Sequence, residues 1–426
     1  MGTQRPGPFF DWLNSAIPSI STVLNEQISA CGYPIYASLD IRDAGWKVAA
    51  VDVNLFPAGF NNLTAEDHAR ASRLMREFLS AKLLVPGPWK ITVVPEGHTN
   101  NKGYLENLVG ILRMLREAGC EPRLLWPGPP IPKPWVVTAP SGFKLEYLPA
   151  EQALEGAQAL ILNHDLSGGI PTAIKNVSLP TFPNPTLGWY RRRKSTHHEI
   201  VDALLAKIER RIPEFDPWYF TMRSRTIANV DFDSDQGLEL IAHEGLAIME
   251  QLKKDYADRG IVETPRIFIK NDAGTYGMGV LSVKNPEDIR QGGRWLRNKM
   301  KKGKDSVAIS QVIIQEAIPS ALIYEATPGT PESMVVGEPV LYLVNGIPVG
   351  GFCRIHEKLG ADARWENLNQ PGSLLRPLAC GEGSVDNYLF PKPRGHTPCE
   401  QIGVHQLYSF VARLHATAAG LEECPE

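Results

Sequence analysis

Apolar and polar positions follow two different periods along the first 130 residues. Two segments, 65–84 and 103–119, place apolar residues three and four apart, which is typical of amphipathic helices. Thr64 can cap the first helix, with Asp67 near its third position, and Gly119 is suited to end the second. Compact apolar runs before, between and after the helices predict strands at 46–56, 90–96 and 122–126. This β-α-β-α-β order predicts a parallel sheet with covering helices.

The pattern changes after a proline-rich connector at 127–134. A further strand is predicted within 157–171, and 185–260 is mostly helical in pattern. From 265 onward the pattern predicts a strand, a loop, a strand, a helix at 285–302, a strand at 309–316 and long antiparallel strands at 335–345 and 347–356. The fold class predicted is α/β in the N-terminal part and α+β in the C-terminal part, with a boundary near residue 165.

One loop carries a candidate chemistry of its own, in the stretch "IFIKNDAGTYGMGVLSV" at 267–283. Lys270 ends an apolar run, three glycines follow, and a second apolar run begins, which predicts a hairpin-like glycine loop. The spacing fits neither a Walker A loop nor a Rossmann turn. Glycines allow backbone N–H groups to approach phosphate oxygens, and a lysine adds a point charge. Taken alone, the loop fits equally a tight hairpin with a surface lysine.

Composition narrows the class of protein. The formal net charge of the 426 residues is -3, so no overall attraction to nucleic acid or acidic membranes is expected. No apolar run is long enough to span a bilayer, and the N-terminus does not have a signal-peptide pattern. The six cysteines show no CxxC spacing, which suits a reducing compartment better than a disulfide framework. We therefore expect a cytoplasmic protein without nucleic-acid or membrane partners.

Polar residues downstream of the glycine loop follow a recognisable order. Gln315 and Glu316 end an apolar strand and suit an adenine and ribose pocket. Glu338 and Arg354 lie on paired strands, and a cluster of Glu366, Asn367 and Asn369 follows. A lysine with a glycine loop, an acidic hinge, a strand carboxylate, an arginine and a Glu/Asn cluster come in the order of an ATP-grasp active site.

These motifs together carry a family resemblance. The segments "KNDAGTYGMG", "EPVLYLVNGIPVGGFCRIHE" and "ENLNQPG" resemble a bacterial, proteobacterial-type family of glutamate–cysteine ligases built on the ATP-grasp fold. The N-terminal half is similar to the same family through "VDVNLFPAGFNNL", "EGHTNNKGYLENL", "LNHDLSGGIP" and "GWYRRRKSTHHE". The chain departs from the family pattern at Cys353, where an aromatic residue is expected, and at Asn345, where an acidic residue is expected.

The resemblance implies an activity and an architecture. The activity is ATP-dependent ligation of the glutamate γ-carboxylate to cysteine through an acyl phosphate, the first step of glutathione synthesis, with Mg²⁺ as cofactor. The architecture is an N-terminal α/β, pre-ATP-grasp-like substrate domain at 1–165 and an ATP-grasp catalytic domain with a helical insertion at 166–426. The partners implied are the small molecules glutamate and cysteine; a homo-oligomer stays open.

The resemblance also implies roles for the nucleotide and metal residues. Lys270 would hold phosphate oxygens, and Arg354 would stabilise the transferring phosphoryl group. The loop residues Gly274, Thr275, Gly277 and Gly279 would cover the phosphates, and Gln315 and Glu316 would bind adenosine. The candidates for Mg²⁺ are Glu338, Glu366, Asn367 and Asn369. The alternatives are a surface glutamate at 316, turn or strand-edge polar residues at the metal positions, and a structural ion pair for Arg354.

The amino-acid substrates have candidate residues in two segments. Asp52, Asn54, Asn61 and Asn62 would lie just beyond the carboxyl end of a parallel strand, where ligands bind in open α/β sheets. The alternative is a turn stabilised by Asn side chains. Arg191 and Arg192 belong to a basic run at 191–194 that suits a carboxylate or phosphate, and the rest of the run suits a solvated face.

Two other functions remain open on the residues alone. A different ATP-grasp ligase, such as a glutathione-synthetase-like enzyme or another γ-glutamyl-amine ligase, would use the same fold. A non-catalytic nucleotide-binding regulator would keep the fold without the chemistry, although the set of Lys270, Glu338 and Arg354 argues against it.

Overall fold

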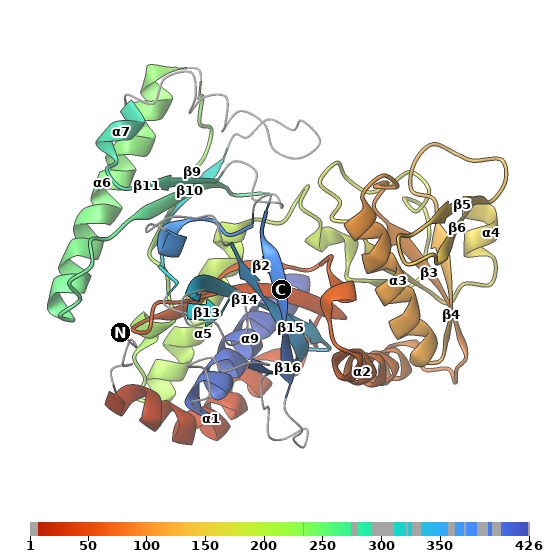
Figure 1. Ribbon diagram of the computed structural model, residues 1–426, viewed down its shortest axis with the longest axis horizontal. Coiled ribbons are helices and arrows are strands. Elements are labelled where there is room, and N and C mark those ends of the chain that lie inside the picture. The colour runs from red at the N-terminus through yellow and green to blue at the C-terminus, as the bar shows by residue number, and fades with distance from the viewer. Residues whose placement is uncertain are drawn as a thin grey trace.

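The computed structural model describes residues 7–232, 234–273, 280–290, 311–320, 323–325, 334–356, 363–369, 372–380, 391–393 and 402–424. These residues form three sheets with helices around them, a mixed α/β arrangement (Figure 1). No helix within the described residues is long and apolar enough to cross a membrane.

The central sheet is antiparallel and combines both ends of the chain. Its order is β17-β16-β15-β14-β1-β2, with β13 also paired to β14. The strands are β1 (Tyr36–Asp43), β2 (Val48–Asn54), β13 (Ile323–Glu325), β14 (Met334–Val344), β15 (Ile347–Ile355), β16 (Leu374–Cys380) and β17 (Pro391–Pro393). The predicted pair at 335–345 and 347–356 is confirmed as β14 and β15. Asn345 and Gly346 both have positive φ, as a two-residue hairpin turn of type I′ requires.

Alternation along β14 explains why its residues 339–344 are all apolar. Leu341 and Leu343 pack in the core that contains α9 (Ile402–Glu423), whereas Val340 and Tyr342 pack in the core that contains α2 (Ala65–Leu83). Side chains of a strand alternate between faces, so a sheet covered on both faces needs apolar residues at successive positions. Helices α1 (Gly7–Ile28), α5 (Lys194–Arg211) and α9 contact one another and form the layer on the first face (Figure 1).

A second sheet is mostly parallel and has the order β5-β6-β4-β3-β7-β8. The strands are β3 (Trp89–Pro95), β4 (Cys120–Leu125), β5 (Trp135–Thr138), β6 (Lys144–Leu148), β7 (Ala159–Asn163) and β8 (Thr181–Phe182). The β5–β6 pair alone is antiparallel among the pairs described. Helices α2, α3 (Lys102–Glu117) and the short α4 (Ala150–Leu154) belong to the same part of the chain.

The predicted helices and two of the predicted strands are confirmed here. Thr64 and Asp67 form a complete capping box at α2, and Gly119 follows α3 with φ 90°. The predicted strand at 46–56 is the exception, since β2 pairs antiparallel with β1 in the central sheet rather than in the parallel one. An apolar run predicts that a strand is buried, but it does not show whether the strand pairs parallel or antiparallel with its neighbour.

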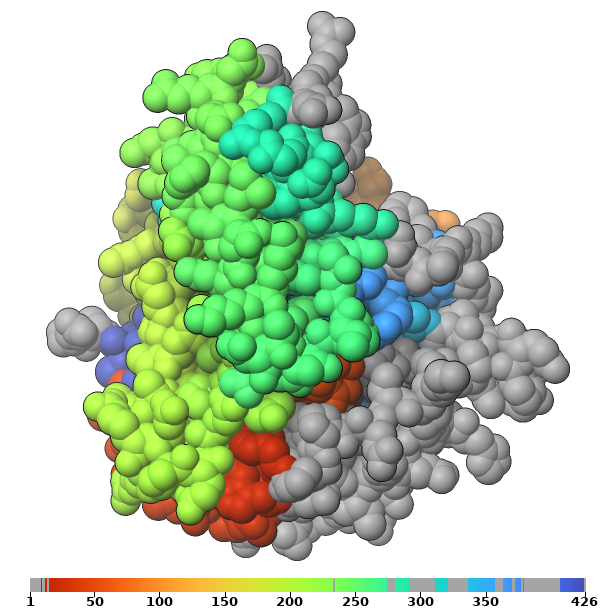
Figure 2. Space-filling model, turned by 90° about the vertical axis from the view of Figure 1, so that its left-hand side faces the viewer, coloured from red at the N-terminus to blue at the C-terminus, as the bar shows by residue number. Residues whose placement is uncertain are grey.

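The third sheet has the order β11-β10-β12-β9. Its strands are β9 (Ser224–Ile227), β10 (Ile267–Asn271), β11 (Val280–Val283) and β12 (Val312–Glu316). Antiparallel pairing of β10 with β11 confirms the predicted hairpin. Helix α6 (Asp235–Asp258) shares a core with this sheet, and Figure 2 shows it on the outer face, with α7 (Glu287–Arg290) packed beside it. Short 3₁₀ helices complete the described elements at η1 (Phe60–Asn62), η2 (Pro185–Leu187), η3 (Pro217–Tyr219) and η6 (Ala363–Trp365).

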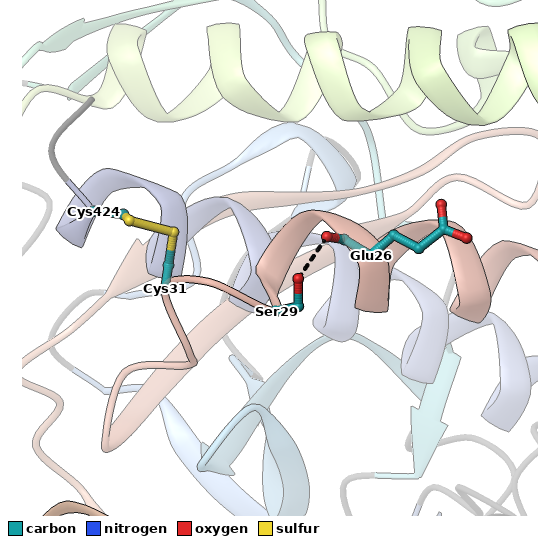
Figure 3. Close-up of a disulfide and its surroundings, with 4 residues drawn as sticks. All are labelled: Glu26, Ser29, Cys31 and Cys424. Atoms are coloured by element: carbon teal, nitrogen blue, oxygen red, sulfur yellow. Dashed lines mark hydrogen bonds between the residues drawn. A yellow bond between two sulfur atoms is a disulfide. The ribbon is translucent and has the colours of Figure 1, made fainter.

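A disulfide joins the two ends of the chain. Cys31, just after α1, is bonded to Cys424, just after α9, across 393 residues of sequence (Figure 3). The expectation of cysteines without a disulfide is therefore wrong for this pair, while Cys120 and Cys353 are buried and take no part in a disulfide. Spacing along the chain cannot reveal such a pair, because packing of α1 against α9 brings the two residues together.

The central sheet also bears on the predicted domains. Strands β1 and β2 precede residue 165, yet β1 is hydrogen-bonded to β14. The central sheet thus includes strands from both sides of the predicted boundary.

Candidate active site

One face of the central sheet carries a row of charged side chains. Asp52 on β2 lies opposite Asp40 on β1, and Asp40 lies opposite Val340 on β14. Glu338 is two residues along β14 from Val340 and lies opposite Arg354 on β15. Because alternate residues share a face, these charged groups line the side of the sheet away from α9.

Lys270 approaches this face from the third sheet. It is near the end of β10, and its Nζ donates to Gln315 Oε1 on β12 (2.9 Å) and to the Val51 carbonyl on β2 (3.3 Å). Only 9% of the residue is exposed. Burial and the nearby Lys194 charge lower the pKa of Lys270 to about 8, while Asp52 opposes that shift. The lysine therefore sits where a bound anion would favour its charged form.

Lys194 brings a second ammonium group to Asp52. It opens α5, forms an ion pair with the Asp52 carboxylate, and lies 4.7 Å from the centre of the Trp189 ring. Burial raises the pKa of Asp52, but the charge and hydrogen bond of Lys194 outweigh it and hold that pKa below its usual value. Two lysines and one carboxylate from three different elements thus meet at this point.

Asp272 fixes the beginning of α5 to the end of β10. Its Oδ1 accepts from the Ser195 backbone N–H (2.8 Å), and its Oδ2 accepts from the Ser195 hydroxyl (2.7 Å) and the Gln311 amide (2.6 Å). A carboxylate is favourable at a helix N-terminus, where backbone N–H groups lack partners within the helix. The start of the glycine loop and the Lys194 turn are consequently held together.

Glu338 lies between two arginines. Its carboxylate accepts from Arg354 and from Arg42 on β1 (2.6 Å), and Arg354 also donates to Asp40 (3.2 Å). Burial raises the pKa of Asp40 to about 6, against the opposing effect of Arg354. Arg42 also donates to the carbonyl of Glu366 (2.6 Å), so it brings the 363–369 segment to the sheet.

Some of the predicted metal ligands therefore lie near one another. Glu338 and the Glu366 backbone share Arg42, and the Asn367 side chain accepts from the Asn369 backbone N–H (2.9 Å) in the following turn. Asn369 is exposed and Glu366 is half-buried. Oxygen atoms dominate this set, which is the donor chemistry that Mg²⁺ prefers.

Gln315 and Glu316 point to opposite faces of β12. The Gln315 amide meets Lys270 and His198 Nε2 (3.0 Å) on the active-site side. Glu316 is 1% exposed, and its two oxygens accept from Lys47 Nζ at 2.9 and 2.8 Å. The reading of Glu316 as a surface residue is therefore wrong, and its role at the ribose stays a prediction.

The predicted amino-acid residues lie in different settings. Arg192 is buried and donates to Glu422 of α9 (2.7 and 3.1 Å) and to the Val53 carbonyl (2.6 Å), whereas Arg191 is exposed. Asn54 ends β2 on the same side as Asp52. Asn61 donates to the Asn62 side chain (3.2 Å) in η1. Because β2 is antiparallel, its end is not the parallel-strand edge on which these positions were predicted.

Four predicted phosphate-loop residues, Gly274, Thr275, Gly277 and Gly279, lie outside the described residues. Asp40 and Arg42 were not among the predicted site residues, and Lys194 was predicted only as part of the basic run at 191–194. The first two had a signal, since charged residues two apart within "YASLDIRD" must share one face of an otherwise buried strand.

This arrangement suits an anionic ligand and a metal ion. Lys270 and Lys194 provide ammonium groups for phosphate oxygens, and Arg354 provides a guanidinium. Glu338 and the 366–369 turn provide oxygen ligands. Most of these groups are buried, so their fields act in a medium that screens them less than water does.

Comparisons with known proteins cover almost the whole chain. A family model described as "GshA: Glutamate-cysteine ligase" matches residues 11–423. A crystal structure from Methylobacillus flagellatus KT, described provisionally as a gamma-glutamylcysteine synthetase, is similar at a TM-score of 0.81 and 31% sequence identity, over 98% of this chain and 96% of that one. No curated protein sequence matches the chain at a significant level.

Proposed function

The chain belongs to the glutamate–cysteine ligase family and is a ligase that joins glutamate to cysteine, and from that premise we propose where and how it does so. ATP is the expected energy source for such a ligase. We propose that ATP binds at Lys270 and that the glutamate γ-carboxylate is activated as an acyl phosphate. The observation that carries the proposal is the meeting of Lys270, Lys194 and Asp52 next to the Glu338–Arg354 pair.

The reaction proceeds in two transfers. A γ-carboxylate oxygen of glutamate attacks the terminal phosphorus of ATP, the phosphoanhydride bond breaks, and ADP leaves. The cysteine nitrogen then attacks the acyl carbon, an amide forms, phosphate leaves and the amine loses a proton. The protein supplies no nucleophile, so its contribution is positioning and electrostatic stabilisation.

The described residues have roles that follow from where they lie. Lys270 and Lys194 bind phosphate oxygens, and Arg354 offsets charge on the transferring group. Gln315 orients Lys270 through their hydrogen bond. The loop residues Gly274, Thr275, Gly277 and Gly279 lie outside the described residues, and their proposed role of covering the phosphates by backbone contacts rests on the sequence.

Mg²⁺ would be held by Glu338 together with Glu366, Asn367 or Asn369. Both Glu338 oxygens accept hydrogen bonds from arginines, but a carboxylate has about four lone-pair sites and can bind a cation as well. The ion supplies charge neutralisation for the triphosphate when it is bound.

The ATP-grasp arrangement is part of the proposal. The sheet β11-β10-β12-β9 would be one half of the nucleotide clamp and the central sheet around β14 and β15 the other. The segments 1–165 and 166–426 would contribute mainly substrate binding and catalysis, with β1 and β2 completing the central sheet. The product is the precursor of glutathione, and we propose a cytoplasmic enzyme.

Phosphate release from ATP and Mg²⁺, with glutamate and cysteine added singly and together, tests this function. Release only with both substrates, accompanied by γ-glutamylcysteine, is expected. Release with glutamate and a different amine would support the ligase mechanism but show that the amine substrate is not cysteine. Nucleotide binding without release under any pairing would contradict the proposal.

A further inference from the structure

The side on which the next strand is added to the parallel sheet reverses between β3 and β7. The chain leaves β3 toward β4 on one side and leaves β7 toward β8 on the other, while β3 and β7 are parallel neighbours. Connections that diverge in this way open a crevice at the carboxyl ends of the two strands, which is where ligands bind in open α/β sheets. This location lies outside the residues assigned above.

Two carboxylates and two imidazoles gather at that point. Glu96 directly follows β3, and His164 and Asp165 directly follow β7. Ligand atoms of these three residues all lie within 4.8 Å of one another, and His98 Nε2 lies 3.7 Å from Glu96 Oε2. Glu96 is 6% exposed and Asp165 is 4% exposed. Such a mixed set can contact both a positive and a negative group.

Hydrogen bonds hold the set rigid. Glu96 Oε1 accepts from the Asp165 backbone N–H (2.9 Å), which joins the two strand ends. The Tyr104 hydroxyl accepts from the Glu96 N–H (2.8 Å) and donates to the Asn163 carbonyl (2.7 Å). The Asn163 amide in turn donates to the Pro57 carbonyl (2.8 Å), in the loop that follows β2. The positions of Glu96 and of the two strand ends are therefore set in advance of any ligand.

The tautomer of His164 distinguishes between kinds of ligand. The Leu166 backbone N–H donates to His164 Nδ1 (3.0 Å), so the hydrogen of the neutral ring lies on Nε2. That N–H faces Glu96 Oε2 at 4.0 Å. A histidine that binds a metal through Nε2 normally donates from Nδ1 instead. The ring is thus arranged to donate a hydrogen bond rather than to bind a metal.

We propose that Glu96, Asp165, His164 and His98 bind the head group of glutamate, an inference that rests on the ligase function proposed above. The carboxylates accept hydrogen bonds from the α-ammonium, and the imidazole N–H groups donate to the α-carboxylate. A zwitterionic amino acid presents both groups side by side, which matches two acceptors and two donors in one crevice.

Glutamate fits this site better than cysteine does. The amine of cysteine must become neutral to attack the acyl phosphate, and two nearby carboxylates favour the charged ammonium form. The ammonium of glutamate takes no part in the reaction. Holding the α-carboxylate of glutamate here would also leave its γ-carboxylate as the group that reaches ATP, which accounts for the γ linkage.

The site is connected to the candidate active site. The Asp165 carbonyl accepts from the Trp189 backbone N–H (2.9 Å), and the Trp189 ring lies under the Lys194 ammonium. Lys194 is paired with Asp52 beside Lys270. The loop that carries His164 and Asp165 therefore leads to the lysines that would bind ATP.

The test compares glutamate with glutarate, which lacks the α-ammonium. In the Glu96→Gln variant of the full chain, we expect the KM for glutamate to rise about 10-fold or more and the preference for glutamate over glutarate to fall by a similar factor. The KM values for cysteine and ATP should stay within about twofold. Asp165→Asn should repeat the result, and Glu121→Gln, an exposed position on β4, is the matched control.

The possible results separate this inference from the proposed function. An unchanged preference for glutamate over glutarate in a folded Glu96→Gln variant that still turns over would overturn the inference alone, as would a selective rise in the KM for cysteine. Zn²⁺ or Mn²⁺ that binds the wild type in equilibrium dialysis and is lost in Glu96→Gln would also overturn it, in favour of a metal site. Absence of ligase turnover in the wild type would instead overturn the proposed function, while calorimetric binding of glutamate that is lost in Glu96→Gln would still support the inference.

Discussion

Lys194 at the first turn of α5 forms an ion pair with Asp52 on β2, across 142 residues of sequence. Both side chains are more than two-thirds buried, at 12% and 26% exposure. The pair lies beside Lys270, and the two ammonium groups repel each other while Asp52 attracts both. Three elements that are remote in sequence thus bring two ammonium groups to one carboxylate, and we propose that this point binds an anion.

Lys270 is predicted to be essential for turnover. Lys270→Ala removes a buried ammonium group that is proposed to bind the phosphates, so we expect kcat/KM for ATP to fall by about 100-fold or more. Phosphate release measures this, and circular dichroism checks the fold. Lys175→Ala, at an exposed lysine, is the control and should turn over normally. Unchanged kinetics in a folded Lys270→Ala variant would show that Lys270 does not belong to the ATP site.

ATP affinity is predicted to depend on pH because of the same residue. The pKa of Lys270 is lowered to about 8, so in the absence of nucleotide the ammonium loses its proton as the pH rises through that value. Binding of ATP should therefore weaken above about pH 8 and take up protons there, which calorimetry in buffers of different ionisation enthalpy can measure. The Lys270→Met variant should lack this proton uptake.

The lowered pKa of Lys270 also predicts that the free energy of unfolding rises with pH, whereas the affinity for ATP falls. The unfolded lysine has the usual pKa of 10.5, so between about pH 8 and 10.5 the unfolded chain binds more protons than the folded one. Lys270 thus lowers the stability of the wild type at neutral pH, and this penalty is lost as the pH rises through the window. Urea unfolding of the wild type and Lys270→Met at pH 7 and pH 10 should show a smaller difference at the higher pH.

Glu316 is predicted to matter chiefly for stability. Its carboxylate and Lys47 form a fully buried pair, and Lys47 Nζ also lies 4.1 Å from the centre of the Trp218 ring. Lys47→Met leaves a buried carboxylate without its cation and should lower the free energy of unfolding by about 3–5 kcal/mol. The double variant Lys47→Met/Glu316→Gln should recover part of that loss. Failure of the double variant to recover, together with a raised KM for ATP, would favour the ribose role for Glu316.

Glu338 is predicted to set the requirement for Mg²⁺. Glu338→Gln keeps the shape of the side chain but removes the charge between Arg42 and Arg354. Turnover should fall by about 10-fold or more and saturate at a higher Mg²⁺ concentration. Titration of phosphate release with Mg²⁺ measures both effects. A lower rate with an unchanged Mg²⁺ dependence would show that Glu338 acts only through the arginines.

The disulfide gives a prediction about the ends of the chain. Cys424→Ser removes the link between the segments after α1 and α9, and a lost disulfide of this kind typically costs about 2–4 kcal/mol of stability. Chemical unfolding of the wild type and the variant measures the loss. Mass spectrometry after alkylation without a reductant should show Cys31 and Cys424 unlabelled in the oxidised wild type; labelling of both would contradict the pairing.

Much of this protein follows from its sequence alone. Periodicity located α2, α3 and β3 and β4, and the run of apolar and glycine residues located the β10–β11 hairpin. Each of these depends on residues close together in the chain, where spacing and turn chemistry act directly. The ordered motifs were also sufficient to recognise the glutamate–cysteine ligase family, because the order of motifs can be read from the sequence without knowing which residues are in contact.

Tertiary structure decided which residues meet. The sequence places Glu316 at the end of a strand, but only the fold supplies Lys47 as its partner, 269 positions away. In the same way, the apolar run at 46–56 predicted a strand. Pairing with β1 decided that this strand, β2, is antiparallel and that Asp52 lies opposite Asp40. Cys31 and Cys424 met through the packing of α1 on α9. Such contacts depend on the mutual placement of whole elements, and a local pattern of apolar and polar residues carries no record of it.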